Sequence, residues 1–233
     1  AKEMRSRVEE LLGESITGMW LGTFHSVGAR ILRRDGDAIG IPANFTIYDE
    51  ADRVAAMRRA IQSIGLDEKR FAPAKVVHAV SAAKNELIDA AAYAARETGF
   101  FEAEVAKAYR AYEAELQAAG ALDFDDLLMR VVQLLRDVPP VLAHYQQRWS
   151  HIFVDEYQDT NHAQYLMVSM LAAQHRNLTV VGDDDQSVYG WRGADIRNIL
   201  EFRRDYSDAR VVTLEQNYRS TQAILDTAHA VIS

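Results

Sequence analysis

Residues 152–161 read IFVDEYQDTN, a short apolar run that ends abruptly in two adjacent carboxylates. Consecutive apolar residues bounded by polar ones are typical of a buried strand in a parallel sheet. Ligand sites in such sheets lie at the carboxyl ends of the strands. This stretch therefore predicts both a fold class and the place where chemistry is expected.

Apolar runs of the same kind recur along the chain and alternate with segments of helical periodicity. The runs that predict strands cover residues 19–24, 45–48, 152–154, 178–181 and 211–214. Helices are expected at both ends of the chain, after the first strand, from Asp123, up to Trp149, from Asn161, from about Asp195 and after Ser220. Short strands separated by helices predict an α/β fold with a parallel sheet covered on both faces.

The sequence changes character between Asp49 and Gly120, where Ala-rich, charged segments dominate. Apolar residues at helical spacing form two stripes there, Val76, Val80, Ala83 and Leu87 in one and Phe101, Val105, Ala108, Tyr112 and Leu116 in the other. This spacing predicts helices. We expect an all-helical insertion subdomain at residues 31–120, between a first part of the sheet-bearing lobe at 1–30 and its remainder at 121–233.

Composition excludes several classes of protein. The chain has 233 residues, of which 48% are hydrophobic and 26% charged, which is enough to bury a core. It has no cysteine, so disulfides, thiolate zinc sites and a cysteine nucleophile are ruled out. No apolar run approaches the roughly 20 residues of a membrane span, and we expect a cytoplasmic protein. The net charge of -8 repels a polyanion at long range, so any nucleic-acid contact must be local.

Two acidic clusters follow predicted strands and are expected to converge at one edge of the sheet. Asp155 and Glu156 form the first, and residues 183–185, all Asp, form the second. Adjacent carboxylates suit a hydrated Mg²⁺ ion, one holding the ion and the other orienting an attacking water. The alternative is that these residues cap the helices that follow.

A polar and aromatic segment follows the second cluster. Gln186 is a neutral amide suited to sensing a phosphate oxygen beside the acids, whereas a glutamine taken in isolation is more often a solvated loop residue. Tyr189, Trp191 and Arg192 lie between glycines in a loop, where two aromatic rings and a guanidinium form a platform for unpaired bases. The alternative is a hydrophobic plug that holds the loop to the sheet.

Two further segments are candidate contacts. Tyr218 and Arg219 follow the last predicted strand, where the ring suits a purine and the guanidinium a terminal phosphate, or else a surface ion pair. Thr23 and His25 begin the first predicted helix after the strand at 19–24, where hydroxyl and backbone N–H groups suit a phosphodiester. A purely structural, helix-capping His25 is the alternative.

Three ordered motifs resemble those of one enzyme family. The stretch VDEYQDTN at 154–161 is similar to motif II of the UvrD, Rep and PcrA family of superfamily 1 DNA helicases. Residues 182–194, GDDDQSVYGWRGA, resemble motif III, and residues 214–220, LEQNYRS, resemble motif IV. GTFHS at 22–26 and DFDDLL at 123–128 also match segments of that family, so the resemblance covers essentially the whole chain.

The resemblance implies a partial RecA-like lobe of the P-loop NTPase class with a helical insertion, in a bacterial, nucleoid-associated protein of DNA repair or replication. ATP and Mg²⁺ would drive movement along single-stranded DNA, 3′ to 5′, and separation of duplex at single-strand/double-strand junctions. The implied ATP-side residues are Asp155 for magnesium, Glu156 for the attacking water, Gln186 and Arg219 for the γ-phosphate, and Tyr218 for adenine. The implied DNA-side residues are Thr23, Phe24, His25, Phe124, Tyr189, Trp191 and Arg192.

The sequence also departs from the family pattern. Family members carry a Gly-rich loop that ends in Gly-Lys-Thr, but this chain contains no Gly-Lys pair. Residues 1–7 resemble the tail of motif Ia, so we expect the missing loop upstream of Ala1 and further motifs downstream of Ser233. The chain alone is then expected to turn over no ATP. The alternative is a non-catalytic module that binds single-stranded DNA.

Overall fold

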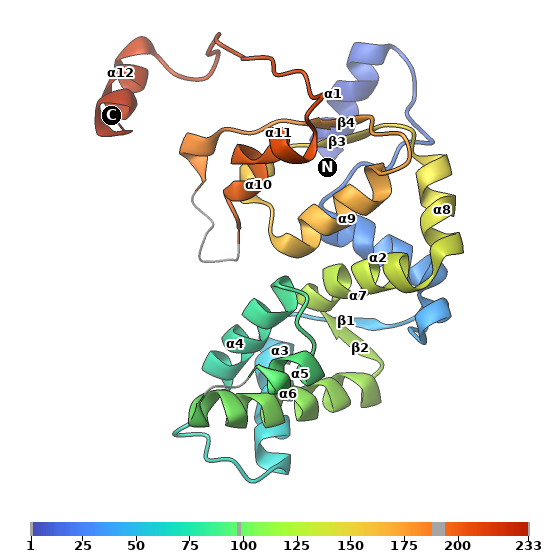
Figure 1. Cartoon of the computed structure of the whole chain (residues 1–233), viewed down its shortest axis with the longest axis vertical. Coiled ribbons are helices and arrows are strands. Elements are labelled where there is room, and N and C mark those ends of the chain that lie inside the picture. Colours follow the sequence, from blue (N-terminus) through green and yellow to red (C-terminus); the bar gives the residue numbers. More distant parts are fainter. Residues whose placement is uncertain (1, 97–98, 188–193, 233) are drawn as a thin grey trace.

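The computed structural model describes residues 2–96, 99–187 and 194–232. Its helices and short strands are arranged in two packed regions, which lie one above the other in Figure 1. One region contains β3 and β4 with the helices around them, and the other contains α3 to α6. The short strands β1 and β2 lie between the two regions (Figure 1).

The first region is built on α2 (Phe24–Asp35), α7 (Phe124–Asp137), α8 (Pro139–Arg148) and α9 (His162–Ala172). Their apolar faces share one core that includes Ile31, Leu32, Leu127 and Tyr145. The contact between α2 and α7 is close, because a Cβ atom on Gly28 would lie 2.8 Å from the carbonyl oxygen of Leu127. Residue 31, the expected start of the insertion, lies inside α2, and α2 packs with the sheet-bearing region.

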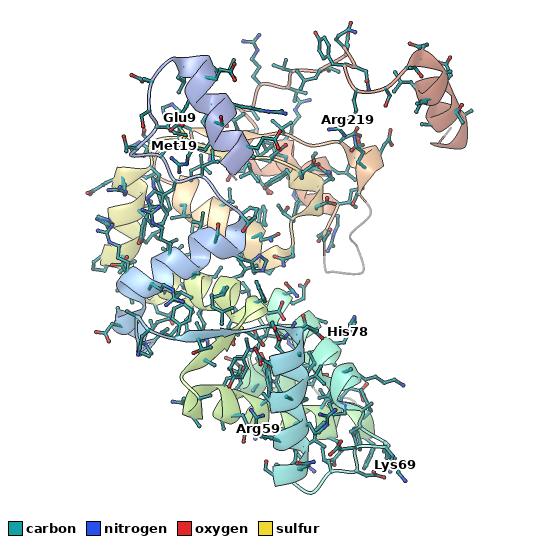
Figure 2. The ribbon with its side chains drawn as sticks, turned by 180° about the vertical axis from the view of Figure 1, so that it is seen from behind. Glu9, Met19, Arg59, Lys69, His78 and Arg219 are labelled. Atoms are coloured by element: carbon teal, nitrogen blue, oxygen red, sulfur yellow. The ribbon has the colours of Figure 1, made fainter. Side chains whose placement is uncertain are left out.

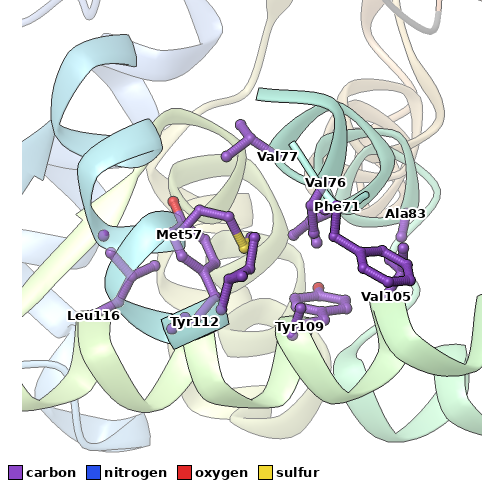
Figure 3. Close-up of a cluster of buried hydrophobic side chains, with 14 of the residues drawn as sticks. Met57, Phe71, Val76, Val77, Ala83, Val105, Tyr109, Tyr112 and Leu116 are labelled. Carbon is purple, nitrogen blue, oxygen red and sulfur yellow. The ribbon is translucent and has the colours of Figure 1, made fainter. Parts of the chain in front are cut away.

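The second region is a bundle of α3 (Glu50–Ser63), α4 (Pro73–Asn85), α5 (Ala90–Ala95) and α6 (Phe100–Ala118). Figure 3 shows its core, where Met57, Phe71, Val76 and Tyr109 lie among other buried side chains. Both predicted stripes contribute to this core, through residues such as Val80 on α4 and Leu116 on α6. The prediction of helices between residues 49 and 120 is therefore confirmed.

The strands form two parallel pairs. The strand β1 (Thr46–Tyr48) pairs with β2 (Ala121–Asp123), and β3 (Ile152–Val154) pairs with β4 (Leu178–Val180). The first pair joins the chain just before α3 to the chain just after α6. It therefore brings together the two ends of the helical bundle, while the second pair carries the acidic segments.

Parallel pairing is confirmed, but the single continuous sheet predicted from the sequence is not observed. Residues 19–24 are not a strand: Trp20 packs edge-on against Trp149, with ring centroids 5.0 Å apart, and α2 begins at Phe24. Residues 211–214 are also not a strand. Val211 and Leu214 are 67% and 79% exposed, and no strand among the described residues pairs with this segment.

The remaining elements lie at the edges of the first region. The helix α1 (Lys2–Leu12) precedes α2, whereas α10 (Arg197–Leu200) and α11 (Phe202–Asp205) are short helices beside β3 and β4. Single helical turns are also found at η1 (Gly36–Ile39), η2 (Tyr157–Asp159) and η3 (Asp184–Gln186). The helix α12 (Gln222–Ile232) stands apart at the end of an extended segment (Figure 1).

Candidate functional site

The two acidic segments meet where β3 and β4 end. The ladder continues past the strands, because Val181 donates its backbone N–H to Val154 at 2.8 Å and Tyr157 donates to Val181 at 3.0 Å. Asp155 and Glu156 follow β3 directly, and both are exposed. The predicted convergence of the two clusters is therefore confirmed.

Glu156 has an unusual backbone conformation for a residue with a side chain. Its φ of 53° and ψ of 45° lie in the left-handed region, where a residue other than glycine carries roughly 1–2 kcal/mol of strain. The Glu156 carboxylate accepts a hydrogen bond of 2.9 Å from the side-chain amide of Gln158. The backbone of this turn and the hydrogen bond from Gln158 together hold the Glu156 carboxylate in one orientation. A carboxylate that takes a proton from a single attacking water must be oriented in this way.

Gln158 joins the two acidic segments. Its side chain is 1% exposed, and its carbonyl oxygen accepts a hydrogen bond of 3.2 Å from the backbone N–H of Asp183. A Cβ atom on Gly182 would lie 2.5 Å from that oxygen, so a larger residue at this position would have to displace the Gln158 amide. On the other side of the junction, Gln186 donates to the Asp183 carboxylate at 2.6 Å.

The helix-capping alternative does not account for the first acidic pair. Asn161 caps α9, because its side-chain oxygen accepts from the backbone N–H of Gln164 at 2.9 Å. The Asp155 carboxylate accepts instead from the adjacent backbone N–H of Glu156, at 3.0 Å. In contrast, Asp183 does cap the turn η3. The carboxylates of Asp155 and Glu156 are therefore available for a ligand.

The site is suited to a cation that keeps part of its water shell. Neither Asp155 nor Glu156 forms an ion pair with a described residue. Partial burial and the charge of Glu156 raise the pKa of the nearby Asp159 carboxyl above its ordinary value. No group of three or more His, Asp or Glu side chains able to enclose a metal occurs among the described residues. These two carboxylates fit Mg²⁺, which is commonly held by one or two carboxylates together with water and phosphate oxygens.

A second cluster brings together three of the predicted DNA-side residues. The rings of His25 and Phe124 meet edge to face with centroids 5.6 Å apart, and Phe124 is 45% exposed. Thr23 caps α2, since its hydroxyl oxygen accepts from the backbone N–H of Ser26 at 3.2 Å. Thr23, and not His25, therefore caps α2, and the His25 ring packs beside the ring of Phe124.

Burial determines the charge of His25. It lowers the pKa of the imidazole below its ordinary value, although the Asp125 carboxylate opposes part of this shift. The ring is therefore neutral at physiological pH and contributes a hydrogen bond or a stacking surface rather than a positive charge. Phe24 is half-buried and packs against the cores on both sides of α2, which is a structural contact.

The remaining predicted residues are not joined to these clusters by any described contact. Tyr218 is 92% exposed, and Arg219 lies on the extended segment that leads to α12. Figure 2 shows Arg219 at the opposite end of the molecule from Arg59 and Lys69 of the helical bundle. Tyr189, Trp191 and Arg192 lie outside the described residues.

A buried charge cluster links the helical bundle to α7. Lys84 is fully buried, and its ammonium contacts Glu113 at 2.7 Å, Asp126 at 2.8 Å and Asp123 at 3.1 Å. Burial alone would lower the pKa of Lys84, but these carboxylates outweigh it and raise the pKa well above its ordinary value. Burial and the Asp123 charge raise the pKa of Asp126 to about 7, against the opposing effect of Lys84.

The residues that hold the site together are not among those predicted from the sequence. Gln158 and Asn161 lie inside the stretch that resembles motif II, but nothing in the sequence distinguishes a buried amide from a solvated one. Lys84 follows Val80 at helical spacing on the apolar face of α4, and a lysine on such a face is a signal in the sequence. The predicted stripe extends to Leu87, but α4 ends at Asn85 and Leu87 lies beyond it with a φ of 58°.

Comparisons with known proteins agree with this geometry. Residues 1–207 match the family model described as the UvrD/REP helicase N-terminal domain. The whole chain is 49% identical to the ATP-dependent DNA helicase PcrA of Leuconostoc citreum and covers 31% of that protein. It is 50% identical to PcrA of Staphylococcus epidermidis strain RP62A and 48% identical to PcrA of Staphylococcus aureus strain Mu50, covering 32% of each.

The chain thus spans about a third of the length of these relatives. Over the described ranges, no helix combines the length and hydropathy that crossing a bilayer requires.

Proposed function

Because the chain belongs to the UvrD/REP helicase family, we propose that it forms part of an ATP-driven motor that moves along single-stranded DNA and unwinds duplex. The observation that carries this proposal is the junction of the two acidic segments through Gln158 and Asp183. It places two exposed carboxylates beside a turn that ends in Gln186. Such an arrangement suits hydrolysis of a nucleoside triphosphate.

On the ATP side, Asp155 would hold Mg²⁺ through its water shell, and Glu156 would accept a proton from the attacking water. Gln186 responds to the γ-phosphate through its neutral amide. A bound Mg²⁺ ion supplies charge neutralisation at the phosphates when nucleotide is present.

Two further ATP-side roles rest on the sequence motif. Arg219 pairs with the γ-phosphate, and Tyr218 stacks on adenine. Both residues are exposed, so they are accessible to a nucleotide that binds between this chain and another part of the protein.

The DNA-side roles follow from stacking chemistry. Phe124 offers a half-exposed ring, and His25 a neutral imidazole in contact with it. Together with Tyr189, Trp191 and Arg192, assigned from the motif, they form a path for unpaired bases. Thr23 lies at the N-terminus of α2, where backbone N–H groups favour phosphate.

The complete protein encoded by the gene that contains this sequence provides the test. With ATP and Mg²⁺ it should unwind a duplex that has a 3′ single-stranded tail, and do so far more slowly when the tail is 5′. Unwinding without ATP, or none on either substrate, would contradict the proposal. We further propose that the 233-residue chain alone turns over no ATP, since it contains no Gly-Lys pair. Steady hydrolysis by the isolated chain would refute this.

A further inference from the structure

We propose that Asn85 is a positioning residue that couples the DNA-side end of α7 to the loop that carries Asp155 and Glu156. This inference rests on the proposed function, since it concerns how DNA binding stimulates ATP hydrolysis. The residue ends α4, in the helical bundle, and contacts neither of the two candidate clusters directly. It is joined to the aromatic cluster through Asp125, and to the acidic loop through Asn161 and the segment that precedes Asn161.

Asn85 uses both ends of its amide. Its nitrogen donates to the Asp125 carboxylate at 3.3 Å and to the carbonyl oxygen of Ser81 at 2.8 Å. Its oxygen accepts a hydrogen bond from the side-chain nitrogen of Asn161. The side chain therefore bridges α4, α7 and the start of α9, and a residue without both a donor and an acceptor would break the bridge.

The Asn161 end of the bridge leads to the acidic loop. Asn161 is 6% exposed and fixed as the cap of α9. Only the single turn η2 and Thr160 separate it from Glu156, and the Thr160 hydroxyl donates to the carbonyl oxygen of Tyr157 at 2.7 Å. Because this segment is buried and hydrogen-bonded, a displacement of Asn161 is passed on to Glu156.

The Asp125 end of the bridge leads to the aromatic cluster. Asp125 follows Phe124 directly, and its carboxylate is also held by Arg53 at 2.7 Å. Its charge acts on His25, whose pKa it raises against the effect of burial. DNA that docks on Phe124 and His25 therefore acts on Asp125, and through it on Asn85.

The neighbouring Lys84 holds α4 in place independently of the hydrogen bonds of Asn85. Its three ion pairs attach α4 to α6 and α7 without involving Asn85. Replacing Asn85 should therefore break the coupling while leaving α4 in place. The expected phenotype is loss of stimulation by DNA, with DNA affinity and basal hydrolysis retained.

The test uses the complete protein with Asn85→Ala, and with Asn44→Ala as the matched control in an exposed loop. Basal ATP hydrolysis, hydrolysis with saturating oligo(dT), the Kd for oligo(dT) and the melting temperature are measured for each. Asn85→Ala should lower the DNA-stimulated kcat about tenfold, a typical size for coupling between sites. Its basal rate, its Kd and the KM for DNA should stay within about twofold of wild type.

The Asn161 end of the bridge provides a second test. Asn161→Asp keeps a side-chain oxygen that caps α9 but removes the donor to Asn85, so stimulation should be lost while α9 keeps its cap. If both residues act in one bridge, the double variant Asn85→Ala/Asn161→Asp should lose no more stimulation than either single variant, which two independent destabilising changes would not produce.

The outcomes separate the two proposals. Absence of DNA-stimulated hydrolysis in the wild-type protein overturns the proposed function. Normal stimulation of the Asn85→Ala variant, or a parallel loss of basal rate and DNA affinity, overturns the role of Asn85 alone. Where Asn85→Ala does not fold, normal stimulation of the Asn161→Asp variant overturns it equally.

Discussion

The backbone of Asp183 donates a hydrogen bond of 3.2 Å to the buried side chain of Gln158, and this bond joins the loops that follow β3 and β4. The same glutamine donates to Glu156 at 2.9 Å. One amide thus aligns a candidate catalytic carboxylate with the turn that contains Gln186. Neither acidic segment is positioned by its own strand alone.

Replacing Gln158 should therefore loosen the site and destabilise the chain. Gln158→Ala leaves the Asp183 N–H without its acceptor, at a cost of about 1–3 kcal/mol in the free energy of unfolding. Urea unfolding measures this cost. The control Gln147→Ala, on an exposed face of α8, should change stability by less than about 0.5 kcal/mol. Equal effects of both variants would show that the Gln158 bridge contributes nothing.

Replacing Lys84 should be among the most damaging single changes. Lys84→Met removes the cation closest to the buried carboxylates of Asp123 and Asp126, whose remaining partners, Arg53 and Arg130, lie at 3.8 and 3.9 Å. Breaking a buried ion pair in this way typically costs about 3–5 kcal/mol. The matched control is Lys107→Met, because Lys107 pairs with Glu104 but is 62% exposed, and its loss should cost less than about 1 kcal/mol. Thermal or urea unfolding compares them, and a stable Lys84→Met variant would contradict this account.

Asp126 should make stability depend on pH. Its pKa in the folded state is about 7, above the ordinary 3.8, so the folded chain binds a proton that the unfolded chain releases. Its contribution is complete below the ordinary pKa and is lost as pH rises toward 7. The free energy of unfolding of wild type, relative to Asp126→Asn, should therefore fall between about pH 4 and 7 and level off above pH 7. A free-energy difference that rises with pH over this range would contradict the raised pKa of Asp126. Asp137→Asn, at an exposed position, serves as the control.

Phe124 should contribute directly to binding of single-stranded DNA. Phe124→Ala removes a half-exposed ring and should weaken binding of an oligonucleotide by about 1–3 kcal/mol, the usual worth of one stacked base. Fluorescence anisotropy measures the Kd in the complete protein. Phe100→Ala removes a similarly exposed ring, 59% accessible, from the helical bundle and should leave the Kd unchanged. Two variants with the same Kd would remove Phe124 from the DNA path.

Much of the fold was predictable because local patterns agree with packing. Helical periodicity located α4 and α6, and the apolar run at 152–154 located β3. The acidic residues at the strand ends followed from the rule for parallel sheets. What these predictions share is that each depends on neighbours close in sequence.

The rest depends on partners that the sequence does not identify. The apolar residues at 19–24 serve to pack Trp20 on Trp149, whereas those at 211–214 remain exposed without a neighbouring strand. The strand β2 has three residues and is defined only by its pairing with β1. Likewise, the bridge from Asn161 through Asn85 to Asp125 joins residues up to 76 positions apart.

Glu156→Gln in the complete protein tests the central claim most directly. The amide has nearly the same shape as the carboxylate but cannot accept a proton from the attacking water. We expect ATP, in the presence of Mg²⁺, to bind with an affinity within about threefold of wild type, while DNA-stimulated hydrolysis falls at least about 100-fold. Turnover close to the wild-type rate, with ATP binding intact, would contradict the assignment of Glu156 and with it the catalytic site at the end of β3.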